Sequence, residues 1–146
     1  MNEDKVKMAS PCGVDCGDCI AHLAVENSPE RKRLISAGFK DEVLPCPGCR
    51  PLKGKCPVIG GSCDTYACFE KKGITFCFEC GEFPCDKLIP AVDKADRALQ
   101  NLKVFNLCYI QKQGLEKWQA RAKDSKRKYF SGKLVYGKGP VESVVL

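Results

Sequence analysis

The chain has 146 residues, twelve of them cysteine, and a formal net charge of +6. Its charged and polar start is unlike a secretory signal, and it contains no run of about eighteen apolar residues that could cross a membrane. We therefore expect a cytoplasmic protein. Because thiols stay reduced in that compartment, the cysteine content favours metal binding over a disulfide framework.

The charge is unevenly distributed along the chain. Residues 1–85 carry 11 Lys and Arg against 12 Asp and Glu, whereas residues 86–146 carry 13 against 6. Metal ligands must be thiolates, so each four-cysteine zinc centre adds a net charge of about −2 to the first part. We expect an acidic metal lobe followed by a basic region.

The first part of the chain begins without regular structure. Residues 1–10 are expected to be disordered, and residues 11–85 to form the cysteine-rich, metal-binding lobe. A short helix is expected just after Cys19. Ser28 and Pro29 then read as the cap and first position of a helix that ends at Gly38, whose Arg31–Arg33 run would be a solvated face.

The densest stretch is Cys46–Cys85, which holds eight cysteines spaced C-x2-C-x6-C-x6-C-x4-C-x8-C-x2-C-x4-C. With five prolines and six glycines between residues 45 and 85, it shows almost no helical or strand periodicity. Short helices are expected at 63–71 and just after Cys80. We expect metal rather than a conventional apolar core to order this segment, since metal binding in such sites contributes on the order of 10 kcal/mol.

The C-terminal part reads as helical. Apolar residues recur at three- and four-residue steps from Asp86 to Gln113, which predicts one long amphipathic helix, and Gly114 separates it from a second helix over 115–128. Residues 86–128 would then form a helical hairpin. Residues 129–146 would be a basic, Gly-rich tail, either a small hairpin or extended. The expected fold is small, metal-rich and irregular/α, with a knuckle-like lobe packed against the hairpin.

Eleven cysteines precede residue 86 and are candidate metal ligands. They are Cys12, Cys16, Cys19, Cys46, Cys49, Cys56, Cys63, Cys68, Cys77, Cys80 and Cys85. Because His22 follows Cys19 by one helical step, it is a candidate twelfth ligand, against a reading as a partly exposed helical histidine. The remaining cysteine, Cys108, reads as a small core residue of the long helix.

The spacing leaves the metal open. Zinc suits tetrahedral thiolate sites built from C-x2-C pairs, and a [4Fe-4S] cluster uses the same ligand. The triplet Cys12-x3-Cys16-x2-Cys19 resembles the cluster-binding motif of radical S-adenosylmethionine enzymes, in which three cysteines leave one iron open. No strand–helix alternation is present to build the β/α barrel of those enzymes.

A second alternative concerns nucleic acid. Basic and aromatic side chains are interleaved after residue 116, a pattern that can contact phosphates and bases. The other reading is an exposed helical face whose aromatic residues, Trp118 among them, belong to the hairpin core. The basic candidates are Lys117, Arg121, Lys126, Arg127 and Lys128.

Three segments together resemble one prokaryotic family. They are Cys12-Gly-Val-Asp-Cys-Gly-Asp-Cys19, Cys46-Pro-Gly-Cys-Arg50 and Cys77-Phe-Glu-Cys-Gly-Glu-Phe-Pro-Cys-Asp-Lys-Leu88. Over residues 11–90 the chain resembles the uncharacterised cysteine-rich family DUF3795. The resemblance implies a small intracellular protein that binds zinc or an iron–sulfur cluster through the same eleven cysteines, with no established activity. At the position of His22, relatives often carry an aromatic residue.

The sequence contains no Gly-rich phosphate loop and no nucleophile elbow, and His22 is its single histidine. We therefore expect a protein that binds zinc at several centres and acts by binding another protein, rather than an enzyme. The pairing of the cysteines, the metal, the partner and the oligomeric state are left open.

Overall fold

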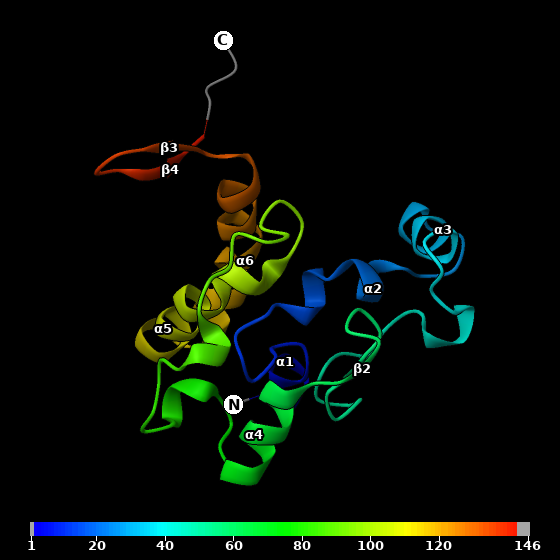
Figure 1. The fold of residues 1–146 in the computed structure, drawn as a ribbon, viewed down its shortest axis with the longest axis horizontal. Coiled ribbons are helices and arrows are strands. Elements are labelled where there is room, and N and C mark those ends of the chain that lie inside the picture. Colours follow the sequence, from blue (N-terminus) through cyan, green and yellow to red (C-terminus); the bar gives the residue numbers. More distant parts are fainter. Residues whose placement is uncertain (1, 143–146) are drawn as a thin grey trace.

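The structure, a computed structural model, describes residues 2–142 (Figure 1). About half of the chain is helical. The α-helices are α1 (Glu3–Lys7), α2 (Ile20–Leu23), α3 (Pro29–Ser36), α4 (Asp64–Lys72), α5 (Lys103–Gln113) and α6 (Leu115–Ser131). Short 3-10 turns are η1 (Cys16–Asp18), η2 (Asp41–Val43), η3 (Cys77–Glu79), η4 (Asp86–Leu88) and η5 (Leu99–Leu102). Two small antiparallel sheets pair β1 (Lys55–Cys56) with β2 (Gly61–Ser62) and β3 (Lys133–Val135) with β4 (Gly139–Val141).

The cysteine-rich part has short elements joined by turns, as its composition predicts. The expected helix after Cys19 is α2, and α3 starts as predicted, because the Ser28 side chain accepts the N–H of Arg31 and Pro29 is the first helical residue. The helix expected near residues 63–71 is α4, which ends at Gly73 with a φ of 64°. The helix expected just after Cys80 is not formed, and that region carries η3 before Cys80 instead.

The N-terminus differs from the expected disorder. Asn2 caps α1, since its side chain accepts the N–H of Asp4. The helix is also fixed to α6, because Lys5 Nζ lies 2.6 Å from a Glu116 carboxylate oxygen and the Gln119 amide donates to the Lys5 carbonyl at 2.8 Å. Contacts over a separation of more than a hundred residues order this segment. Met1 lies outside the described residues.

The single helix predicted over 86–113 is wrong. The backbone forms η4, an irregular turn and η5, and α5 begins at Lys103. Pro90 cannot continue a helix, and Lys94 adopts the left-handed region at φ 58°. The Asn101 side chain also holds both backbone groups of Ala91, at 2.8 and 2.9 Å. Val92, assigned by the pattern to the apolar face, is 93% exposed.

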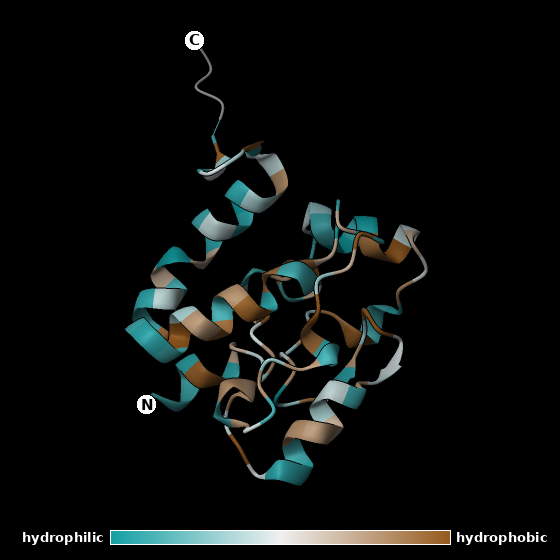
Figure 2. Cartoon of the chain, turned by 60° about the vertical axis from the view of Figure 1, so that its left-hand side comes forward, coloured by the Kyte–Doolittle hydropathy of each residue, from teal (hydrophilic) through white to brown (hydrophobic). Residues whose placement is uncertain are grey.

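The helical hairpin itself is present as α5 and α6, joined at Gly114, and α6 runs three residues beyond the predicted end. Beyond Gly132 the β3–β4 hairpin stands at the far end of α6, away from α4 and β2 (Figure 1). Figure 2 shows α6 to be largely hydrophilic along the length that leads to this hairpin. The last four residues of the predicted tail, 143–146, lie outside the described residues.

Two apolar clusters hold the molecule. The larger joins the hairpin to the cysteine-rich part and contains Ala9, Phe76, Leu88, Leu107, Ile110, Leu115, Trp118 and Ala122. The smaller contains Ala21, Ala24, Leu34, Leu44 and Cys46. Full burial of a large apolar side chain contributes about 1.5–3 kcal/mol. Apolar packing therefore reaches further into the cysteine-rich part than its composition suggests. No helix within residues 2–142 is long and apolar enough to span a membrane.

Candidate metal centre

The first three candidate ligands lie on a tight turn between α1 and α2. Ser10 supports this turn, because its Oγ accepts the N–H of Val14 at 2.8 Å and lies 3.2 Å from the sulfur of Cys12. Cys16 begins η1, and Cys19 is the residue that precedes α2. All three thiols are half-buried.

Cys46 and Cys49, the next pair of candidate ligands, lie beside this turn although they follow it by about thirty residues in the sequence. The N–H of Cys46 donates to the carbonyl of Ala21 at 2.8 Å, which fixes the C-x2-C loop beside α2. Within the loop the N–H of Gly48 donates to the sulfur of Cys46 at 3.5 Å, and the backbone N–H of Cys49 lies close enough to the Cys16 thiol to lower its pKa. Backbone N–H groups directed at sulfur stabilise thiolates.

Charge coupling shows how closely these thiols are grouped. Burial is the main reason that the pKa of Cys16 and of Cys49 is raised to about 12, and the charges of neighbouring thiols raise both further. We call the set they form the upstream thiol group: Cys12, Cys16, Cys19, Cys46, Cys49, Cys56 and Cys63. Cys56 lies in β1 and Cys63 precedes α4, so the group gathers residues from three separate parts of the chain.

His22 lies at the edge of this group. Its Nδ1 is 2.7 Å from the carbonyl oxygen of Cys46. A carbonyl can only accept, so Nδ1 carries a proton and donates it, which leaves Nε2 as the ring nitrogen that could bind a metal, as in many metal-ligating histidines. The tautomer thus suits His22 as a ligand, and its role stays a prediction.

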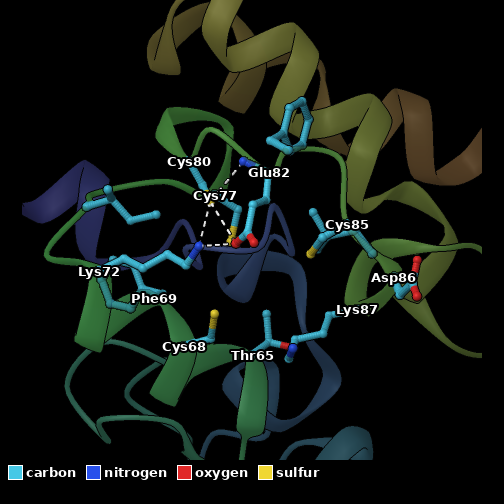
Figure 3. Close-up of a pocket in the computed structure, with 13 residues that line it drawn as sticks. Thr65, Cys68, Phe69, Lys72, Cys77, Cys80, Glu82, Cys85, Asp86 and Lys87 are labelled. Atoms are coloured by element: carbon cyan, nitrogen blue, oxygen red, sulfur yellow. Dashed lines mark hydrogen bonds and ion pairs between the residues drawn. The ribbon is translucent and has the colours of Figure 1, made fainter.

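The other candidates form the downstream thiol group: Cys68, Cys77, Cys80 and Cys85. They line a cavity of about 310 Å³ between α4, η3 and η4 (Figure 3). Cys77 also lies near Cys12, since the charge of that thiol raises its pKa. The N–H of Cys77 donates to the carbonyl of Pro11 at 2.9 Å, which joins the two groups.

The donor set fits a thiophilic metal. Each of the twelve cysteines is a free thiol, and clustered thiols with backbone N–H groups aimed at them are the ligands that zinc and iron–sulfur clusters take. As they lie, no three Cys, His, Asp or Glu side chains within residues 2–142 converge tightly enough to hold an ion. Cys108, expected in the core, is instead exposed on α5.

The basic residues of α6 are largely engaged with the protein. Lys126 Nζ lies 2.8 Å from a carboxylate oxygen of Asp18. Arg127 pairs with Asp124 and Glu142, and the Arg121 guanidinium lies 5.1 Å from the ring centre of Tyr109. Trp118 is 1% exposed, as expected of a core residue.

Two arginines that the sequence did not single out shape the lobe. Arg50 donates to the carbonyls of Val6, Ala9 and Thr75. Arg31, read as part of a solvated face, instead has a largely buried side chain, which donates to four oxygens of Ala24, Asp41 and Leu44. The carbonyl partners are non-local backbone groups, so nothing in the local pattern marks them.

A protein family model described as "Protein of unknown function (DUF3795)" matches residues 8–90 of the chain. This range contains both thiol groups. No curated protein and no solved structure matches the chain.

Proposed function

The chain belongs to the DUF3795 family, whose function is unknown, and from its geometry we propose that it is a multi-zinc protein that acts as a binding module. The upstream thiol group would hold the principal centre, with His22 as a further donor. Zinc would supply a closed, redox-inert link between parts of the chain that lie far apart in the sequence. Such a protein would work in a reducing compartment such as the cytoplasm, where its thiols remain available.

The observation that carries this proposal is the meeting of Cys16 and Cys49. They are separated by 32 residues, yet the backbone N–H of Cys49 lies close enough to the Cys16 thiol to lower its pKa, and the charge of Cys16 raises the pKa of Cys49. Bringing buried thiols together is unfavourable for the metal-free protein once any of them ionises. A bound cation reverses that effect, because it favours every thiolate at once.

The arrangement favours zinc over an open iron–sulfur cluster. An open cluster at Cys12, Cys16 and Cys19 needs one coordination position without a protein ligand. Here Cys46 and Cys49 lie near Cys16, so further thiolates are at hand to close the site. Closed four-ligand sites are typical of structural zinc, which supports a role in binding rather than in catalysis.

Elemental analysis of protein purified without oxygen tests this proposal. We expect a colourless protein that contains zinc in a fixed molar ratio greater than one. A brown protein with broad visible absorption and bound iron would show that the protein holds an iron–sulfur cluster instead of zinc. A preparation that contains neither metal and cannot take up zinc under reducing conditions would contradict the proposal.

A further inference from the structure

We propose that Cys68, Cys77, Cys80 and Cys85 bind a separate divalent metal ion in the cavity between α4 and η4, and that Lys103 neutralises part of its charge. This inference rests on the proposed function and adds to it the assignment of four ligands to one centre. It also gives the buried Lys103 an anionic partner, since no carboxylate in residues 2–142 forms an ion pair with it.

The four cysteines come from one short stretch of chain. Cys68 lies on α4, the pair Cys77 and Cys80 brackets η3, and Cys85 precedes η4. Figure 3 shows their sulfurs directed into the same space, with Cys68 on the α4 side and Cys85 on the opposite wall. Cys12 is near Cys77 but does not line the cavity, so we assign it to the upstream thiol group.

The turn around Cys80 is shaped to hold a thiolate. The N–H of Glu82 donates to the Cys80 sulfur at 3.4 Å, and Lys72 Nζ lies 3.1 Å from the same sulfur. The Glu82 carboxylate binds Lys72 in turn and lies 3.9 Å from Cys80 (Figure 3). Hydrogen bonds from the surroundings to a ligating sulfur orient it and tune the bound metal.

The charged side chains that line the cavity sum to zero if the thiols are left out. Lys72 and Lys87 are positive, and Glu82 and Asp86 are negative. A divalent ion held by four thiolates carries a net charge of about −2. A positive charge from outside the cavity lining would offset part of it.

Lys103 can supply that charge. It is 9% exposed, and it belongs to none of the ion pairs found in residues 2–142. It is also the first residue of α5, where the helix dipole disfavours a cation. A buried lysine in such a place needs an anionic neighbour. Cys77 can be that neighbour as a thiolate, because α5 packs directly against η3, the turn that Cys77 begins.

Metal stoichiometry tests the assignment of the ligands. The double variant Cys68→Ser/Cys80→Ser should lose one molar equivalent of zinc relative to the wild-type protein. Cys12→Ser should keep that equivalent, and Cys108→Ser, which changes the exposed lone thiol of α5, should keep all of them. If the double variant folds, as judged by circular dichroism, and retains the full zinc content of the wild type, the separate centre is ruled out while the proposed function stands. A wild-type protein that binds no metal would rule out both.

Lys103 is tested by competition against a chromogenic chelator under reducing conditions. We expect Lys103→Met to lower the affinity for one of the zinc ions by about 10- to 100-fold, the range seen when a residue that supports a ligand is lost. The other equivalents should be unchanged, and Lys103→Arg should restore the affinity. If Lys103→Met weakened all equivalents alike, or none of them, Lys103 would not be the counter-charge of this centre.

Discussion

Arg50 connects its own loop to two other parts of the cysteine-rich lobe through hydrogen bonds. Its Nε donates to the carbonyls of Val6 and Ala9 at 3.1 and 2.8 Å, and its other end donates to the carbonyl of Thr75 at 2.7 Å. The guanidinium also lies over the ring of Phe76, 5.0 Å from its centre. Burial lowers the pKa of Arg50, which means that burying its charge is unfavourable. The three carbonyls and the Phe76 ring compensate for this by replacing the water that the guanidinium loses.

Replacing Arg50 with alanine should lower the free energy of unfolding by about 3 kcal/mol, since three carbonyls lose a charged donor. Arg50→Lys is the matched control. It keeps the charge but cannot reach three acceptors in one plane, so it should recover only a minor part of the loss. Denaturant unfolding of the zinc-loaded protein gives both values. A change within about 0.5 kcal/mol for Arg50→Ala would contradict the role assigned to this side chain.

The pair of Arg31 and Asp41 makes a pH-dependent contribution. The hydrogen bond from Arg31 lowers the pKa of Asp41 below its ordinary value of 3.8. A carboxyl with a lowered pKa contributes stability that is present above the unfolded value and is lost as the pH falls through the folded value. In thermal unfolding between about pH 5 and 2, the wild type should therefore lose more stability than Asp41→Asn. Parallel profiles would show that the pair contributes nothing.

At the scale of elements, Gly13 sets how closely the first cysteine turn approaches α5. A Cβ at this position would lie 2.6 Å from the carbonyl oxygen of Lys103 and 2.9 Å from Leu107. The residue also has a φ of 89°. The Asn106 amide donates to the Gly13 carbonyl at 2.8 Å, so the turn and the helix are held in direct backbone contact.

The matched pair Gly13→Ala and Gly38→Ala separates close approach from backbone strain. Both glycines have positive φ, but a Cβ at Gly38 meets nothing within 4 Å. We expect Gly38→Ala to cost about 1–2 kcal/mol for its backbone conformation alone. Gly13→Ala should cost about 1–3 kcal/mol more, because α5 or the turn must shift. Equal losses in chemical denaturation would show that the contact with α5 is not tight.

Local signals in the sequence predicted several elements well. The Ser28-Pro29 start of α3, the short helix at residues 63–71 and the break at Gly114 each depend on a few adjacent residues, so they could be predicted directly. The stretch 86–102 could not, because its apolar spacing suits a helix while Pro90 and the Asn101 clamp on Ala91 prevent one. Helical periodicity shows that a segment could bury one apolar face as a helix. It does not show that the segment does so in the fold.

The sequence names candidate metal ligands but does not show how they are grouped. Spacing marks eleven cysteines as candidate ligands, which stays a prediction, and it cannot tell which of them lie together, because tertiary contacts bring Cys16 and Cys49 together. The residues that we propose to balance the charge, Lys103 and the Lys72–Glu82 pair, belong to no sequence motif. Their roles appear only once α4 and α5 are placed beside η3.

For the whole molecule, the charge distribution still allows nucleic-acid binding by the basic C-terminal region. Three of the five predicted basic residues, Arg121, Lys126 and Arg127, already contact carboxylates or aromatic rings. Any such binding should therefore depend mainly on Lys117 and Lys128. Titration with a single-stranded oligonucleotide should show affinity that falls steeply with added salt and is weakened by Lys117→Ala/Lys128→Ala. Unmeasurable affinity at low salt would remove this alternative.

We propose that bound metal holds the region from Cys12 to Cys85 in its fold, while α5 and α6 keep more of their structure through the apolar cluster around Trp118. Hydrogen exchange before and after treatment with a strong chelator, with a reductant present, tests it most directly. We predict that amide protection in residues 12–85 collapses on metal removal, that protection in α5 and α6 falls less, and that added zinc restores both. Unchanged protection of residues 12–85 after complete metal removal would contradict the account.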